Sequence, residues 1–214
     1  GSWPFFNGVL YFNYTFWIGV HSSLMPVSIN GNTGVITGLA VGGLPDGIVD
    51  ADTLATGAGG KILQVKQAVQ TSRVSETLTN NTYTDISGLT VDIQPTATSN
   101  KILVCYHLGL CTNSGTYNLM TRIMRGSTAI GIGDQVGSNR QRASNIGWTI
   151  SGYQMVNYDN MFLDSPNTTS STTYKVQWTD SYGETAYLNR VFNDGDSKYY
   201  PTSMSHITVM EVSA

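Results

Sequence analysis

The pattern of apolar and polar positions differs between the first sixty residues and the rest of the chain. From Lys61 onward, short segments of alternating apolar and polar residues are separated by clusters of Gly, Pro, Asn, Asp and Ser, which is the pattern of strands joined by turns. No segment after Lys61 keeps a helical period for two full turns. Strands are predicted at 62–68, 83–87, 89–93, 102–110, 117–124, 129–132, 149–156, 173–178, 186–191 and 204–212. Short strands at this spacing indicate an all-β domain, a jelly roll or β-sandwich, over residues 61–214.

Two of these segments carry apolar residues on both faces. The even-numbered positions from Ile102 to Leu110 are apolar, and the odd-numbered positions include Leu103, Cys105 and His107. Both faces of this strand are therefore predicted to be buried, as in the centre of a sandwich. The segment 204–212 leaves two interpretations open, a strand covered by its own chain or a strand packed against neighbouring subunits.

The first sixty residues divide into two zones. Residues 1–30 form an aromatic-rich segment, predicted as β structure, in which Asn7-Gly8 has the sequence of a tight hairpin turn. Such a segment must pack on another surface. Residues 31–60 form a linker between a turn cluster at 30–34 and a Gly-rich stretch at 57–60. Within it, Ile48, Ala51 and Leu54 recur at helical spacing; so short a helix is unstable alone, but three copies sharing this seam would form a trimeric shaft.

Composition narrows the possible partners. Only 12% of the residues are charged and the formal net charge is -3, so nucleic acid is not expected as a partner. The apolar stretch 3–20 is interrupted by polar residues, and membrane insertion is not expected. Cys105 and Cys111 lie six residues apart in one predicted strand, roughly 20 Å along it, which is too far for a disulfide. They are predicted to be reduced and buried, which fits assembly in a reducing cytoplasm.

The chain carries no strong catalytic signature. His107 and Cys111 lack metal-site spacing in a strand, the segment 193–196 lacks the pattern of a calcium loop, and Gly131–Asp134 is interpreted as a turn. No cofactor, metal or enzymatic activity is expected. Carboxylates that would serve glycoside hydrolysis if suitably paired occur mostly in turn sequences: Asp159, Asp164, Asp180, Glu184, Asp194 and Asp196.

Exposed aromatic residues beside Asn, Asp and Arg are the residue types that bind glycans, because sugar faces stack on rings and hydroxyls need hydrogen-bonding partners. Trp148 follows Arg140, Arg142 and Asn145. The candidate ligand-binding residues are Trp148, Tyr182, Asp194, Tyr199 and Tyr200. The alternative is that these aromatics are core residues at strand ends.

Several short sequence segments, taken in order along the chain, resemble the C-terminal domain of tail-fibre proteins from marine and cyanobacterial phages. They are 61–67 (KILQVKQ), 85–91 (DISGLTV), 98–104 (TSNKILV), 124–131 (MRGSTAIG), 162–169 (FLDSPNTT) and 207–212 (ITVMEV). The upstream segment 43–55 (GLPDGIVDADTLA) is similar to the short shaft element that often precedes that domain. The resemblance covers roughly residues 31–214, and residues 1–29 match nothing in it.

The resemblance implies a homotrimeric fibre that ends in a jelly-roll knob, similar to tumour-necrosis-factor and C1q heads. The expected function is host-surface attachment within the virion, with other tail proteins and a host glycan or protein as partners. Family motifs fix no receptor-contacting residue. The alternatives are a head fibre, decoration or connector protein without a receptor role, a glycan depolymerase or esterase, and a non-viral secreted adhesin with a C1q-like head.

Overall fold

The computed structural model describes residues 28–30, 35–37, 61–113, 118–148 and 153–214. The chain divides into two units, Gly1–Leu54 and Ala55–Ala214. In the first unit, β1 (Ser28–Asn30) and β2 (Val35–Thr37) pair antiparallel on either side of the predicted turn cluster at 30–34. The predicted shaft residues Ile48, Ala51 and Leu54, and the predicted hairpin around Asn7-Gly8, lie outside the described residues.

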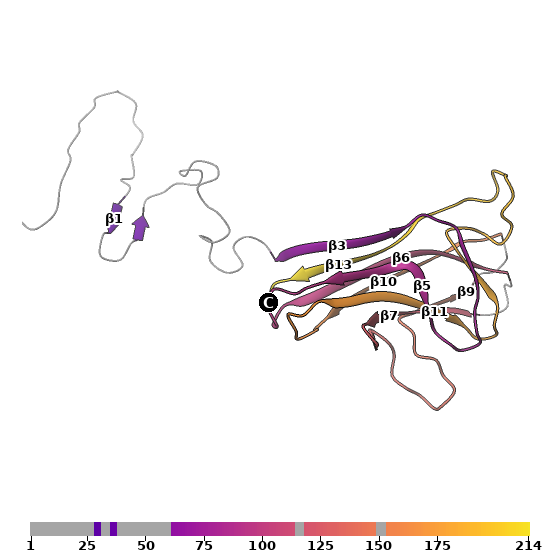
Figure 1. Cartoon of the computed structure of the whole chain (residues 1–214), viewed down its shortest axis with the longest axis horizontal. Helices are drawn as coiled ribbons and strands as arrows, with labels where there is room; N and C mark the ends of the chain where they lie inside the picture. The colour runs from indigo at the N-terminus through magenta and orange to yellow at the C-terminus, as the bar shows by residue number, and fades with distance from the viewer. Residues whose placement is uncertain (1–27, 31–34, 38–60, 114–117, 149–152) are drawn as a thin grey trace, which may run out of the picture. The chain divides into compact units, whose positions relative to one another are not determined.

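The second unit is built from two antiparallel sheets (Figure 1). The long strand β6 lies in the middle of the first sheet, with β10 along one edge. The other edge of β6 is shared by β13, which pairs with its first half, and β12, which pairs with its end. Outside these lie β3 and β4. The strands are β3 (Ile62–Gln70), β4 (Val74–Thr77), β6 (Lys101–Thr112), β10 (Val156–Asp164), β12 (Thr185–Leu188) and β13 (Ser205–Val212).

In the second sheet β11 lies between β5 and β7, and the outer edge of β7 is shared by β8 and β9. The strands are β5 (Thr84–Ile93), β7 (Asn118–Arg125), β8 (Thr128–Ile130), β9 (Asn145–Trp148) and β11 (Thr172–Asp180). The described residues contain no helix. The predicted all-β class is therefore confirmed, and the architecture is compatible with a β-sandwich.

The core forms where the alternation predicts it, because alternate side chains of each strand point to the inner face of its sheet. The even-numbered residues of β6 from Ile102 to Leu110 are at most 2% exposed, and they meet Tyr174, Val176 and Trp178 of β11. The inner residues of β13, Ile207 and Val209, are fully buried beside β6. One continuous apolar core thus joins both sheets.

The structure has a single strand through Gly88, where the sequence predicts two strands. The segments 83–87 and 89–93 are predicted separately, but β5 runs through Gly88 with a register shift against β11. Gly88 has φ +80, which costs glycine little and other residues more. The resulting β-bulge resets the alternation, so that Ile86 and Leu89 both face the core.

Three strands were missed or misplaced by the pattern. β4 was not predicted, and the prediction of a strand at 149–156 is wrong for Tyr153–Met155, which are not in a strand. β9 ends at Trp148, and β10 begins at Val156. β10 escaped prediction because its inner positions include Asn160 and Asp164, whereas its outer positions include the apolar Met161 and Leu163.

Candidate functional site

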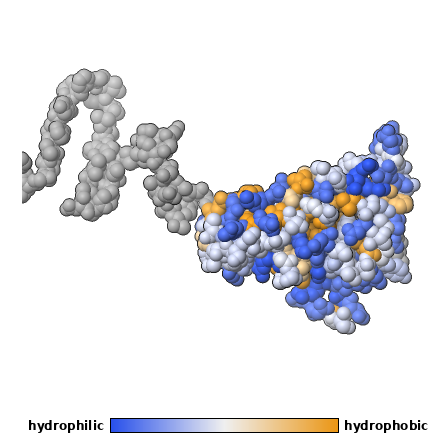
Figure 2. All heavy atoms as spheres, in the orientation of Figure 1, coloured by the Kyte–Doolittle hydropathy of each residue, from blue (hydrophilic) through white to orange (hydrophobic). Residues whose placement is uncertain are grey.

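The face of the first sheet that points away from the core is apolar along one row. Cross-strand pairing aligns Val65 of β3 with Met210 of β13, Met210 with Leu103 of β6, and Leu103 with Leu163 of β10. Val65 and Leu163 are 53% and 52% exposed. Further exposed apolar side chains on this face are Val69 and Met161, and hydrophobic residues reach the surface over β3 and β13 (Figure 2). We call the outward-pointing side chains of β3, β13, β6 and β10 the outer apolar face.

A polar row crosses the same face. His206 of β13 pairs with His107 of β6, and His107 pairs with Asp159 of β10. The His107 Nδ1 atom lies 2.6 Å from Asp159 Oδ1, and the two imidazole rings stack with centroids 5.8 Å apart. The Nδ1 atom of His206 is buried and has no hydrogen-bond partner among the described residues. A second polar pair on this face is Gln67 of β3, whose Nε2 atom donates to Thr208 Oγ1 of β13 at 2.8 Å, so the face combines apolar and polar rows.

These observations correct the prediction that β6 is buried on both faces. Its odd-numbered residues Leu103, Cys105 and His107 are only half-buried. Cys105 is accordingly not a core residue, whereas Cys111 is fully buried in a small cluster with Tyr187 and Val191. Neither cysteine forms a disulfide bond.

The outer face of the second sheet is different, because its polar side chains bind one another. Asp85 accepts hydrogen bonds from Lys175 Nζ and Gln177 Nε2, both at 2.6 Å. Arg122 donates through Nε to Gln177 Oε1 at 2.8 Å and stacks on the Tyr83 ring at 3.9 Å. This part of the outer face is suited to water, whereas Ile146 and Trp148 of β9 are exposed apolar side chains on the same face.

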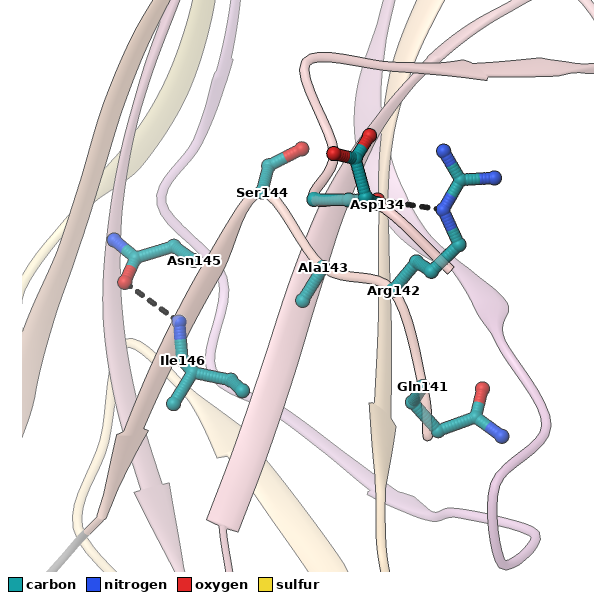
Figure 3. Close-up of a pocket in the computed structure, with 8 residues that line it drawn as sticks. Asp134, Gln141, Arg142, Ala143, Ser144, Asn145 and Ile146 are labelled. Atoms are coloured by element: carbon teal, nitrogen blue, oxygen red, sulfur yellow. Dashed lines mark hydrogen bonds between the residues drawn. The ribbon is translucent and has the colours of Figure 1, made fainter. Parts of the chain in front are cut away.

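The loop between β8 and β9 projects from the sandwich (Figure 1), and a hollow of about 390 Å³ lies beside it (Figure 3). This hollow is a largely open depression of mixed polar and apolar lining, and not an enclosed cavity. It is lined by Gly133, Asp134 and the run from Gln141 to Ile146.

Hydrogen bonds hold the loop around this hollow in place. Gln135 Nε2 donates to the carbonyl oxygens of Gly137 and Arg140, and Arg142 Nε donates to the Gly133 carbonyl oxygen at 2.6 Å. The Tyr83 hydroxyl donates to the Arg142 carbonyl oxygen. The walls are thus fixed by contacts within the loop and to the second sheet.

Asn145, at the inner end of the hollow, is also engaged. Its Nδ2 atom donates to the Asp159 carbonyl oxygen at 2.8 Å, and its Oδ1 atom accepts from the Ile146 backbone N–H (Figure 3). Because both polar atoms of the Asn145 side chain already have partners, other residues of the hollow are better placed to bind a ligand. Among the described residues, the Asp134 carboxylate, the Gln141 amide and the Arg142 η-nitrogens have no hydrogen-bond partner.

Trp148 lies on the same strand as the wall of the hollow. Ile146 lines the hollow, and Trp148 is two residues further along β9, so both point to the same side. They are 53% and 56% exposed. The alternative interpretation of Trp148 as a strand-end core residue is wrong.

The other predicted ligand-binding residues lie in different loops. Asp194, Tyr199 and Tyr200 belong to the loop between β12 and β13, and Tyr182 to the loop between β11 and β12. Tyr199 and Tyr182 are exposed, whereas Tyr200 is half-buried, stacks with Tyr153 and packs against the Cys111 cluster.

Asp194 is held by two cations. Arg73 Nη1 lies 2.7 Å from Asp194 Oδ1, and Arg190 Nη1 lies 3.3 Å from Oδ2. The first ion pair connects the β12–β13 loop to the turn between β3 and β4, and the second lies within the loop. Asp194 therefore orders its loop, and no contact of the described residues links it to Trp148.

The carboxylates considered for hydrolysis are dispersed. Asp164 binds Arg125 and Tyr174, and Asp180 accepts the backbone N–H groups of Tyr182, Gly183 and Glu184. No group of three or more potential metal ligands gathers in the part of the chain that the structure describes. Within the same residues, no helix has the length and apolar character needed to span a membrane.

Sequence reasoning found Trp148 and the neighbouring Arg142 and Asn145, but it missed Asp134 and Gln141. Asp134 was interpreted as part of a turn, and only the folding of the loop brings it to Arg142. Nothing in the local pattern marks Gln141 as part of the hollow. No model of a known protein family matches the chain, and no curated protein matches its sequence.

Proposed function

We propose that the chain is the tip of a phage fibre, that it works as a homotrimer, and that it attaches the virion to a host surface. The observation that carries this proposal is the outer apolar face. A single chain would expose Val65, Val69, Met161 and Leu163 to water, and apolar patches of this kind mark surfaces of association. That three chains assemble is inferred from the resemblance to tail fibres.

The strand connections support the jelly-roll arrangement that the resemblance implies. Going along the chain, β3 belongs to the first sheet, β5 to the second, β6 to the first and β7 to the second. β8 and β9 stay in the second sheet, β10 returns to the first, β11 belongs to the second, and β12 and β13 belong to the first. Repeated crossing from one sheet to the other is a feature of double-sheet Greek-key folds such as jelly rolls.

The partner that covers the outer apolar face is proposed to be the same face or an edge of a sister chain. The face offers an apolar row for burial and the His107–His206–Asp159 row for polar contacts, which is the mixture found in homomeric interfaces. Sister chains would then present three identical ligand sites, and multivalency would raise the overall avidity of weak single contacts.

Light scattering coupled to size exclusion tests the assembly. A mass of three 23.1 kDa chains is expected at micromolar concentration, and the Val65→Arg variant is expected to elute as a monomer. Thr90→Arg is the matched control, because Thr90 is an exposed strand residue on the outer face of the second sheet. A wild-type chain that stays monomeric would contradict the proposal.

Attachment is tested by competition. The purified trimer is expected to block adsorption of the phage that carries this chain, and a fluorescent trimer is expected to label host cells. Virions that adsorb equally well with and without saturating trimer, together with unlabelled cells, would show that the chain has no receptor role.

A further inference from the structure

We propose that the hollow between Asp134 and Ile146, together with Trp148, binds a neutral glycan of at least two sugar units. This inference rests on the proposed function and names the ligand class for it. The site is a hollow whose walls are fixed by hydrogen bonds and whose rim keeps uncommitted polar groups. Such preorganisation is typical of ligand sites, since little ordering entropy is lost on binding.

The uncommitted groups match the hydroxyls of a sugar. The Asp134 carboxylate accepts hydrogen bonds from two neighbouring hydroxyls, and the Arg142 η-nitrogens donate to hydroxyl oxygens. The Gln141 side chain both donates and accepts. Among the described residues these three side chains leave those atoms without protein partners, whereas Gln135 and Asn145 use theirs within the loop.

The charges of the hollow favour a neutral ligand. One carboxylate and one guanidinium line it, so the lining has no net charge. An anionic sugar placed against Arg142 would also meet the carboxylate of Asp134, because Arg142 is bonded to Gly133, the residue before Asp134. Repulsion between the two carboxylates would offset the attraction of the cation.

The length of the ligand follows from β9. Trp148 lies two residues beyond Ile146, roughly 7 Å further along the strand, and both side chains are on the same side. A ring seated in the hollow touches Ile146, and the next ring along the glycan reaches the indole of Trp148. Stacking of an apolar sugar face on an indole supplies the binding free energy that the polar hollow lacks.

Gly133 permits a direct test, because a Cβ atom there would meet no protein atom within 4 Å. Because Gly133 also lines the hollow, a Gly133→Leu side chain is expected to take up part of its space without displacing the protein. The matched control is Gly195→Leu in the β12–β13 loop, where a Cβ atom would make only ordinary contact with the Tyr200 ring, at 3.6 Å. Neither glycine has a positive φ, so both substitutions are compatible with the backbone.

The probes are mono-, di- and trisaccharides of glucose, galactose and mannose, with an acidic set that contains uronic or sialic acids. Binding to the full chain is measured by saturation-transfer NMR and calorimetry. We expect a neutral disaccharide to bind more tightly than its monosaccharide. Gly133→Leu should weaken both at least about tenfold, whereas Gly195→Leu should leave them unchanged. Trp148→Ala should reduce the disaccharide to the affinity of the monosaccharide.

Binding of the acidic set alone, binding of no saccharide, or binding that Gly133→Leu does not affect would each overturn the inference. The proposed function is separable from it in the adsorption assay. If the wild-type trimer and its Gly133→Leu variant block adsorption equally, attachment stands and the hollow is not the receptor site. If neither blocks adsorption although the sugars bind, the site stands and host attachment falls.

Discussion

The hydroxyl of Tyr174 donates to Oδ2 of Asp164 at 2.6 Å, and this hydrogen bond joins β11 of the second sheet to β10 of the first. Arg125 of β7 also binds Asp164, with its Nη1 atom 2.8 Å from Oδ1 and 3.0 Å from Oδ2. Asp164 and Tyr174 are buried, and burial, followed by the bond to Asp164, raises the pKa of the Tyr174 hydroxyl. The three residues form a polar tie across the sandwich.

Asp164→Ala is predicted to destabilise the domain by about 3 kcal/mol, because it leaves Arg125 unpaired and the buried Tyr174 hydroxyl unsatisfied. Tyr174→Phe, which keeps the ion pair, is expected to cost about 1 kcal/mol. Urea unfolding at a fixed protein concentration measures both.

The control for this tie is the surface pair Lys175–Asp85, whose Nζ–Oδ2 distance is 2.6 Å. Lys175→Ala is expected to cost less than about 1 kcal/mol, because water screens this pair. If Asp164→Ala and Lys175→Ala lowered the free energy of unfolding equally, the buried contacts of Asp164 would contribute no more than a surface ion pair.

The carboxylate of Glu211 is expected to make the free energy of unfolding decrease at acidic pH. Its side chain is fully buried, and burial by itself would raise the carboxyl pKa, but hydrogen bonds from Gln64, Asn100 and Thr96 outweigh it and lower the pKa to about 2. The carboxyl group therefore binds protons more readily in the unfolded chain. Its contribution, about 3 kcal/mol, is complete above the unfolded pKa of about 4.3 and disappears as the pH falls towards 2.

Glu211→Gln tests this contribution. The variant is expected to be less stable than the wild type at pH 7, and the difference is expected to shrink as the pH falls from 5 to 2. Chemical unfolding at a series of pH values measures it. Parallel stability curves for the two proteins across this range would refute the role of the carboxylate.

The sequence predicts the strands whose inner residues are apolar and misses those in which polar residues also point inwards. β11 alternates cleanly, and the inner residues of β6 from Ile102 to Leu110 are all apolar, because inner residues must be apolar to join the core. β10 does not follow this pattern, since it carries Asp164 inwards and Met161 outwards. The exposed apolar residues of β10 belong to a face whose role depends on neighbours, and a single chain's pattern does not reveal them.

The candidate site was only partly predictable for a related reason. Trp148 and Arg142 stand close together in the sequence, so their combination is visible there. Asp134 joins them only through the loop, whose closure depends on the bond from Arg142 to Gly133 and on the bonds of Gln135. Local propensity identifies such a loop as turns but does not determine which of its side chains meet.

Gly147 makes a close contact that fixes β9. A Cβ atom at this position would lie 2.7 Å from the Tyr158 hydroxyl oxygen and 2.8 Å from its Cζ atom, and Tyr158 is a buried core residue. Gly147→Ala is therefore predicted to displace β9 and to destabilise the domain by about 1–3 kcal/mol. Thermal unfolding measures the loss, and the displacement should also lower any binding that requires Ile146 and Trp148.

The double variant Gly147→Ala, Tyr158→Phe is the control. The Tyr158 hydroxyl is buried and has no hydrogen-bond partner among the described residues, so its removal alone should cost little. In the double variant it should restore part of the lost stability. If the stability changes of the two substitutions simply add, the alanine does not destabilise the domain through contact with the Tyr158 hydroxyl.

The different burial of the two thiols allows the proposed assembly to be tested by their rates of alkylation. Cys105 is half-buried on the outer apolar face, whereas Cys111 is fully buried beneath Tyr187 and Val191. Burial raises the pKa of both thiols, and the thiolate is the reactive form. In a monomer, iodoacetamide at mildly alkaline pH is expected to modify Cys105 and to leave Cys111 intact.

Assembly through the outer apolar face would hide Cys105 as well. Alkylation, followed by mass spectrometry of peptides, is therefore expected to be slow in the wild-type protein and faster in Val65→Arg, whose substitution lies on β3 and away from the thiol. Thr90→Arg should behave as the wild type, and Cys105→Ser should remove the modification. Equal rates in wild type and Val65→Arg would show that sister chains do not cover this face, because the thiol beside Met161 and Thr208 would then be open to solvent in both.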